Sequence, residues 1–233
     1  MKKKSYKPLY KKFIRLRKNI QNRNKLYKFK KTKWQNFLKQ VINLKKQKLR
    51  LYDHTIYYKP KFGFNFKNKF RFHLFAKQSL KLFYGSLTEK NLDTITNKTY
   101  KKFKSQKNDL FLNKKSFFLQ TLESRLDTIL YRTQFVQSMR KAKQLISHGK
   151  VYLNGKKIEI NSYEIKKGDL IEIHNTSHDF LKKEMRSAEM HYVIPKYLEL
   201  NYKTFQCIII SYIFYNKIMY NFPFWLNLNI LIK

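Results

Sequence analysis

Three of the five glycines in this 233-residue chain lie close together, at Gly149, Gly155 and Gly168. Each follows a stretch whose apolar residues are regularly spaced, at a point where the chain has to turn. Glycine adopts the positive φ angles of helix ends and tight hairpins at little steric cost. Residues 119–173 are therefore predicted to form a compact unit that is rich in turns.

The apolar spacing predicts two helices in this unit. The first carries one helical stripe, made of Leu119, Leu122, Leu126, Ile129 and Leu130. Four charged residues fall largely outside the stripe: Glu123, Arg125, Asp127 and Arg132. The second helix starts after Ser138 as its N-cap and ends at Gly149. Its predicted core face consists of Met139, Ala142, Leu145 and Ile146.

Strands follow the second helix. Residues 151–153 form a short strand before Asn154-Gly155, a strong signal for a two-residue hairpin turn. Strand character returns over 157–160, and again over 170–173 after the turn at Gly168. The expected class is α+β, with two helices packed on a small, bent antiparallel sheet.

The rest of the chain divides by composition. Residues 1–31 are a basic arm whose aromatic residues either stack on bases or anchor the arm to the fold. Residues 32–110 are a helical domain, with helices from Thr32, over 70–83 and over 88–104. Residues 111–204 hold the turn-rich unit. Residues 205–233 are apolar but too interrupted for a membrane span, and their Ile, Phe and Tyr favour buried strands packed on the fold.

The net charge of +38 limits the function classes most strongly. Residues 1–110 carry 33 Lys and Arg against four acidic residues. Such self-repulsion opposes a compact state unless a polyanion neutralises it, and nucleic acid is the obvious polyanion. The single cysteine, Cys207, excludes an internal disulfide and a cysteine-cluster zinc site, and no metal or cofactor is expected.

The same unit resembles a known family. ESRLDTILYR, AKQLISHGKVYLNGKKI and SYEIKKGDLIEI resemble the RNA-binding domain of the ribosomal protein S-four family, which also occurs in RNA-modifying enzymes and some aminoacyl-tRNA synthetases. Residues 80–92 and 193–204 look like the flanking segments of the ribosomal members. The arm over 13–34 is similar to the organellar branch. A mitochondrial protein is expected, with a plastid as the alternative, and the bias toward Lys, Asn, Phe, Tyr and Ile suits an AT-rich organellar genome.

The resemblance implies binding of folded rRNA through shape and phosphates rather than through sequence. The expected RNA-binding residues are Arg125, Arg132, Arg140, Lys141, Lys143, His148, Lys150, Lys156, Lys157, Arg15, Arg17, Lys59 and Lys61. For Arg125 an internal ion pair with Asp127 is the alternative, and for His148 a role in capping the helix. Gly149, Asn154, Gly155 and Gly168 are expected to form turns. The chain departs from the family at Lys143, where Arg is usual, and at Gln134, where Gly is usual.

Two functions compete. The first is a structural protein of the small ribosomal subunit that supports early assembly, touches neighbouring proteins and lies near the path by which mRNA enters. The second is a pseudouridine synthase, because Arg125-Leu126-Asp127 matches the R-L-D motif of those enzymes. In those enzymes, however, the motif follows the RNA-binding domain after a long catalytic sheet. Here it lies inside the domain's first helix, so a non-enzymatic function is expected.

Overall fold

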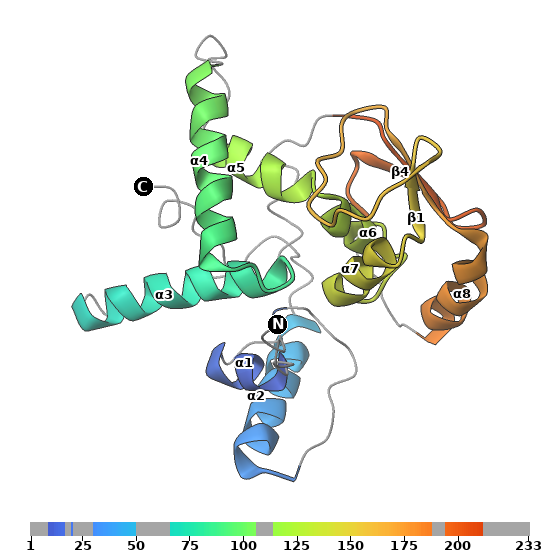
Figure 1. The fold of residues 1–233 in the computed structure, drawn as a ribbon. Helices are drawn as coiled ribbons and strands as arrows, with labels where there is room; N and C mark the ends of the chain where they lie inside the picture. The colour runs from blue at the N-terminus through green and yellow to red at the C-terminus, as the bar shows by residue number, and fades with distance from the viewer. Residues whose placement is uncertain are drawn as a thin grey trace, which may run out of the picture.

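The computed structural model describes residues 9–16, 20, 30–49, 66–105, 114–187 and 194–211. The RNA contacts expected for Arg17, Lys59 and Lys61 lie outside these residues. So does most of the apolar C-terminal segment, from residue 212 onward. Within the described part, the fold is α+β as expected: a helical N-terminal part is followed by further helices and one antiparallel sheet (Figure 1).

The N-terminal part is helical. It contains α1 (Leu9–Leu16), α2 (Thr32–Leu49), α3 (Phe66–Phe83) and α4 (Glu89–Ser105), and α2 to α4 match the predicted helices to within a few residues. Phe13 of α1 is buried, and the ring of Tyr10 meets Trp34 edge-on, with 6.0 Å between centroids. These two arm aromatics therefore anchor α1 to the fold.

The first predicted helix of the turn-rich unit is in fact two helices. α5 (Lys114–Glu123) ends, and α6 (Leu126–Arg132) begins after Arg125, whose backbone is extended. A segment beyond the hairpin takes the backbone hydrogen bonds at this break: Leu126 N donates to Tyr163 O at 2.9 Å, and Ile165 N donates to Ser124 O at 2.8 Å. All five residues of the predicted apolar stripe are buried on either side of the break.

α7 (Met139–Ser147) has the predicted caps at both ends. The Ser138 hydroxyl accepts a hydrogen bond from Lys141 N. At the other end Gly149 has φ +65°, and Gly149 N and Lys150 N donate to Ile146 O and Leu145 O. These two bonds form a Schellman motif, which satisfies the last carbonyls of the helix and requires the left-handed conformation that glycine adopts most easily.

The sheet has the strand order β2-β1-β3-β5-β4, and every neighbouring pair is antiparallel. The strands are β1 (Val151–Leu153), β2 (Lys156–Lys157), β3 (Leu170–Ile173), β4 (Leu198–Asn201) and β5 (Gln206–Ile209). β1 and β3 have the predicted bounds, whereas β2 stops before Ile158. Because β5 lies between β3 and β4, a domain boundary at 204/205 would cut this sheet.

Residues 174–187, which follow β3, are largely helical. They form the 3-10 turn η1 (Asn175–Ser177) and α8 (His178–Ser187). The His178 ring bonds the Ile173 carbonyl at 2.7 Å, and Leu181 is fully buried. The His178 ring and the buried Leu181 side chain therefore hold α8 against the end of the sheet (Figure 1).

Asn154 does more than turn the β1–β2 hairpin. Its φ of +49° lies in the left-handed region, as the turn requires. Its side-chain oxygen also accepts from Leu170 N at 2.9 Å, and its amide nitrogen donates to Asp169 Oδ1 at 3.0 Å. The hairpin turn is thereby fixed to the turn before β3.

Among the described residues, no helix is long and apolar enough to cross a membrane.

Candidate nucleic-acid interface

A buried network joins the helical part to the sheet. Glu123, at the end of α5, is fully buried and accepts two hydrogen bonds from Arg132, at 2.9 Å and 2.7 Å. Tyr84, after α3, donates to Glu123 Oε1 at 2.6 Å, and Tyr197, before β4, donates to Oε2 at 3.2 Å. We call Tyr84, Glu123, Arg132 and Tyr197 the junction network.

This network overturns one expectation. Arg132 was expected to contact RNA, but it is buried, its fork faces Glu123, and its guanidinium lies 5.1 Å from the centre of the Phe83 ring. A buried ion pair with additional hydrogen bonds fixes the orientation of both side chains, because a buried charge that loses its partner is not stabilised by water. Arg132 therefore connects α6 to α5 and does not form part of an RNA-facing surface.

Arg125 is likewise internal, and the ion-pair alternative is the one observed. Its Nε and NH2 groups donate to the two carboxylate oxygens of Asp127 at 3.0 Å and 2.9 Å, and both side chains are buried. The charged residues that were placed outside the apolar stripe are thus buried in pairs. Each pair cancels its own charge within the helix junction.

Burial and the nearby carboxylate shift the tyrosines of the junction network. Burial is the main cause that raises the pKa of Tyr84 and the pKa of Tyr197 well above the ordinary value of tyrosine. The negative charge of Glu123 raises both further. Above about pH 10 an unfolded tyrosine ionises while these two remain neutral, so the folded state binds more protons there and loses stability as pH rises.

That sign gives a testable expectation. The stability difference between the wild type and a Tyr197→Phe variant should shrink above pH 10, because the variant lacks one group whose ionisation favours unfolding. Each such group changes the slope by about 1.4 kcal/mol per pH unit. Urea unfolding of both proteins at pH 8, 10 and 11 measures it. A constant difference across that range contradicts the assigned burial of the Tyr197 hydroxyl.

The three cations expected on the outer face of α7 point to different places. The Lys141 amine pairs with Glu184 and lies 3.6 Å from the centre of the Phe180 ring, so it holds α8. Lys143 donates to the Gly85 carbonyl at 3.0 Å and lies 3.7 Å from Asp127, and burial lowers its pKa. Arg140 remains half-buried on the first turn of the helix.

The end of α7 and the β1–β2 hairpin carry four of the predicted residues. The Lys157 side chain lies across Gly149, so close that a Cβ on the glycine would stand 1.8 Å from Lys157 Cε. His148 and Lys150 flank that glycine, and Lys156 precedes Lys157 on β2. We call His148, Lys150, Lys156 and Lys157 the hairpin surface. His148 caps α7 through its backbone, while its ring stays exposed.

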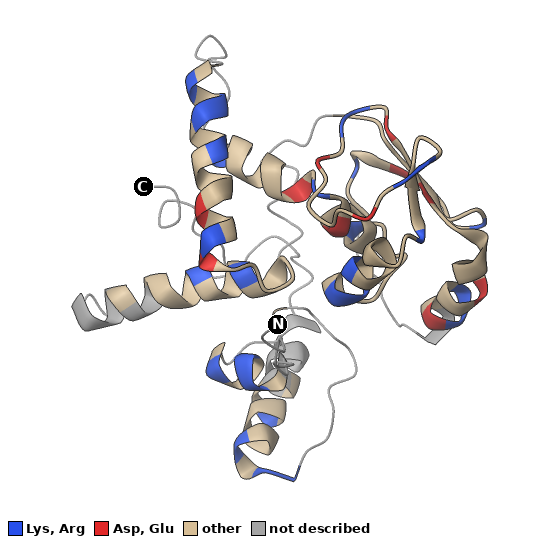
Figure 2. Cartoon of the chain, viewed as in Figure 1, with Lys and Arg blue, Asp and Glu red and all other residues tan. Residues whose placement is uncertain are grey.

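The charges of the hairpin surface are available to a ligand. Lys156 and Lys157 are exposed, Lys150 is half-buried with its amine 3.0 Å from the Thr176 hydroxyl, and Lys157 pairs with the exposed Glu159 at 2.8 Å. An exposed ion pair of this kind is weak and easily exchanged for a phosphate contact. Figure 2 shows the wider distribution, with basic positions recurring on α3, α4 and α7 and acidic ones at the end of α5 and on α8.

Comparison with known proteins identifies the family. A family model described as the S4 domain matches residues 124–171, which contain α6, α7 and the hairpin. The small ribosomal subunit protein uS4m of Marchantia polymorpha is 34% identical over 173 residues, covering 71% of this chain and 81% of that protein. This chain belongs to the uS4 family.

Bacterial members of the uS4 family match a shorter part. The small ribosomal subunit protein uS4 of Aquifex aeolicus is 38% identical over 135 residues, 57% of this chain and 60% of that protein. The uS4 of Pelagibacter ubique is 38% identical over 128 residues, 55% of this chain and 58% of that protein. The chain therefore spans less than two thirds of these two bacterial relatives.

One position where the sequence departs from the resemblance lies in the turn between α6 and α7. Gln134, where glycine was expected, has φ +63° and so lies in the left-handed region. A residue with a Cβ pays roughly 1–2 kcal/mol for that conformation. The burial of the residues that follow Gln134 directly, Phe135 and Val136 among them, holds the chain in this turn.

Gly149 offers a local test of the hairpin surface in this uS4 chain. Gly149→Ala should cost about 1–2 kcal/mol of unfolding free energy from its positive φ, and it should also displace Lys157. Gly155→Ala is the matched control, because its φ is +76° but nothing lies within 4 Å of the added Cβ. We expect similar stability losses and weaker RNA binding for Gly149→Ala alone. Equal RNA affinities for the two variants would contradict the placement of Lys157.

Some residues that build the site in this uS4 chain were not predicted from the sequence. Tyr84 and Tyr197 lie in the two flanking segments that resemble the family. Nothing in the spacing of their neighbours indicated that both contact Glu123. Tyr152, on the outer side of β1, stacks on His174 with 5.7 Å between ring centres. The burial of Glu123 could have been predicted from the sequence, because acidic residues are rare in this basic chain and this one adjoins the apolar stripe.

Proposed function

We propose that this chain is a structural component of the small ribosomal subunit that binds small-subunit rRNA through the hairpin surface and Arg140. The observation that carries the proposal is the separation of charges in the S4 domain. Arg125, Arg132, Glu123 and Asp127 neutralise one another inside the fold, whereas Lys156 and Lys157 of the hairpin surface are exposed and Lys157 lies against Gly149.

The geometry suits an RNA backbone. A-form RNA hides its base edges in a deep, narrow groove, so a protein meets phosphates and 2′-hydroxyls over a wide surface. Lysines on a short hairpin and at a helix end present point charges without a fixed hydrogen-bond pattern, which favours phosphate contacts over base contacts. Shape recognition of a folded rRNA junction is the expected mode.

The cellular setting follows from the relatives. Organellar translation, in the mitochondrion rather than the plastid, is supported by the match to a protein named uS4m and by the similarity of residues 13–34 to the organellar branch. We also propose a role in early subunit assembly, contact with neighbouring small-subunit proteins, and a position near the path by which mRNA enters. These finer roles rest on the family resemblance.

An enzymatic function has less support. A pseudouridine synthase would need Asp127 as a nucleophile open to a nucleotide. Instead the Asp127 side chain is 1% exposed, and both of its oxygens accept hydrogen bonds from Arg125. Incubating the protein with small-subunit rRNA and mapping pseudouridine tests this directly. We expect no new modification, and any pseudouridine formed by the wild type and lost in Asp127→Asn would restore the enzyme hypothesis.

Binding to rRNA tests the main proposal. Labelled small-subunit rRNA is titrated with the full chain, with excess tRNA as competitor, at several salt concentrations. The affinity should fall steeply with salt, with a slope of about −0.9 per phosphate contact in a duplex. It should also survive the competitor. If tRNA competes as well as unlabelled rRNA, the chain recognises charge alone and the proposal fails.

A further inference from the structure

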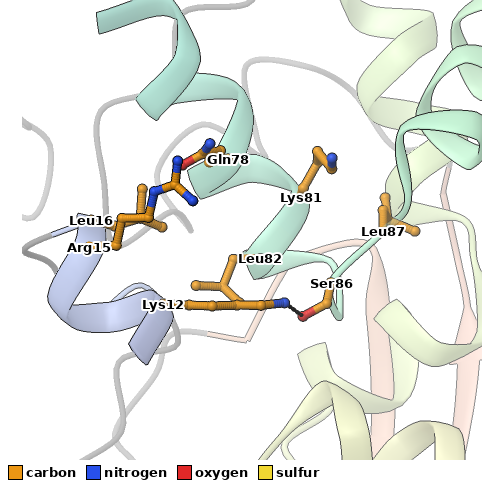
Figure 3. A pocket seen from close by; sticks show the side chains of 8 residues that line it. All are labelled: Lys12, Arg15, Leu16, Gln78, Lys81, Leu82, Ser86 and Leu87. Carbon is orange, nitrogen blue, oxygen red and sulfur yellow. Dashed lines mark hydrogen bonds between the residues drawn. The ribbon is translucent and has the colours of Figure 1, made fainter. Parts of the chain in front are cut away.

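A pocket lies between α1 and the end of α3 (Figure 3), and no residue of the hairpin surface lines it. It has a volume of about 200 Å³, and α1 contributes Lys12 and Arg15 to its wall. Gln78 and Lys81 come from α3, and Ser86 from the turn that follows α3. Three leucines form its apolar side.

The pocket is strongly cationic. The Lys81 amine pairs with the Glu89 carboxylate at 2.5 Å. Glu89 also pairs with Lys77, at 2.9 Å. Arg15 is exposed, and no carboxylate pairs with it among the residues that the structure describes. The Lys12 amine donates to the Ser86 hydroxyl at 3.1 Å, which holds it at the pocket rather than in solvent. Three cations on two separate elements thus face one small volume, and Glu89 pairs with one of them, Lys81.

The size of the pocket and the chemistry of its donors limit the class of ligand that it can bind. Pockets that enclose a whole small molecule are usually about 300–1,000 Å³, so this one is small for a nucleotide but adequate for a single tetrahedral anion. The planar fork of a guanidinium matches two phosphate oxygens, while an ammonium group supplies a point charge. Figure 3 shows Arg15 reaching from α1 toward Gln78 on α3, with the amine of Lys12 directed at Ser86.

We propose that this pocket binds one backbone phosphate of structured RNA, with Arg15 as the bidentate donor and Lys12 and Ser86 as supporting donors. The proposal rests on the proposed rRNA binding and assigns it a second contact, distinct from the hairpin surface. A phosphate there bridges α1 and α3, because its donors come from both. Binding therefore relieves the repulsion between these cations and fixes α1 on the helical part.

α1 is already positioned for that bridge. Phe13 and Leu16 are buried on one side of the helix, so Lys12 and Arg15 are left beside α3 and the turn after it. The same turn is held from the other side, where Lys143 of α7 donates to Gly85 O at 3.0 Å. A phosphate in the pocket consequently lies next to the point where the S4 domain meets the helical part.

Ethylation interference on small-subunit rRNA tests the proposal with the full chain. The double variant Lys12→Gln/Arg15→Gln removes the donors, and Lys33→Gln/Lys39→Gln on α2, which are exposed and do not line the pocket, is the matched control. We expect the pocket variant to bind about tenfold more weakly, with its salt slope shallower by about 0.9 for the phosphate contact that it loses. At least one phosphate whose ethylation weakens the wild type should have no effect on the variant.

The outcomes separate this inference from the proposed function. If the wild type binds rRNA specifically and every interfering phosphate is shared with the pocket variant, the pocket holds no phosphate and the inference is wrong. If the wild type does not bind rRNA specifically, the proposed function fails first. An equal loss in the α2 control shows a general charge effect and also overturns the inference. Urea unfolding of each variant verifies that the fold is retained.

Discussion

Replacing Glu123 by alanine should lower the free energy of unfolding by about 3–5 kcal/mol, which is a large part of the stability of a domain. The change leaves Arg132 buried without its carboxylate and removes the acceptor of both Tyr84 and Tyr197. A buried charge without a partner costs more than the pair itself contributes, so the loss exceeds that of any surface ion pair. Urea unfolding followed by circular dichroism measures it.

The matched control is Glu159→Ala. Glu159 also pairs with a basic residue, Lys157, at 2.8 Å, but both side chains are exposed. Exposed pairs contribute little, so this variant should unfold at the same urea concentration as the wild type. If the two alanine variants lose the same stability, Glu123 is not the centre of a buried network.

Reversing the charge at Lys150 and Lys156 together should weaken binding to small-subunit rRNA by about a hundredfold at low salt. Each lysine contributes sequence-independent attraction to phosphates, and a glutamate in its place adds repulsion. The slope of log affinity against log salt should fall by about 0.9 for each contact removed. Filter binding over a range of salt concentrations gives both quantities for the variant and the wild type.

A double reversal on α8, Lys182→Glu/Lys183→Glu, changes the net charge by the same amount. Both lysines are exposed and lie outside the hairpin surface. We expect only the small loss that comes from the altered total charge. A comparable loss in both double variants would show that RNA responds to net charge, and the assignment of the hairpin surface would be withdrawn.

The sequence predicted the S4 domain well where local rules decide the structure. Ser138 and Gly149 cap α7 as expected, and Asn154-Gly155 turns the hairpin, because each position needs a particular side chain or a positive φ. These features depend on a few adjacent residues. They are therefore visible in a single sequence.

Pairing over long distances decided the rest. The break between α5 and α6 depends on residues 163–165, which supply backbone partners to Ser124 and Leu126 from beyond the hairpin. The burial of Glu123 depends on Tyr84 and Tyr197, which are separated from it by 39 and 74 positions. Helical spacing alone cannot reveal such partners.

The same limit applies to the cations that were expected to contact RNA. A cation at an outward helix position looks available to RNA whenever its partner is remote in sequence. Lys141 is bound by Glu184, and Lys143 by the carbonyl of Gly85. Lys143 also replaces the usual arginine of the family. Its single amine fits beside Gly85, where even an added Cβ would stand 2.7 Å from Lys143 Nζ.

Sedimentation of organelle extract through a sucrose gradient, with detection of this chain in each fraction, tests the central claim most directly. We expect the chain to migrate with the small ribosomal subunit and with intact ribosomes. It should leave those fractions when ribonuclease digests the rRNA. Recovery of the chain only at the top of the gradient, or with the large subunit alone, would contradict its proposed place in the small subunit.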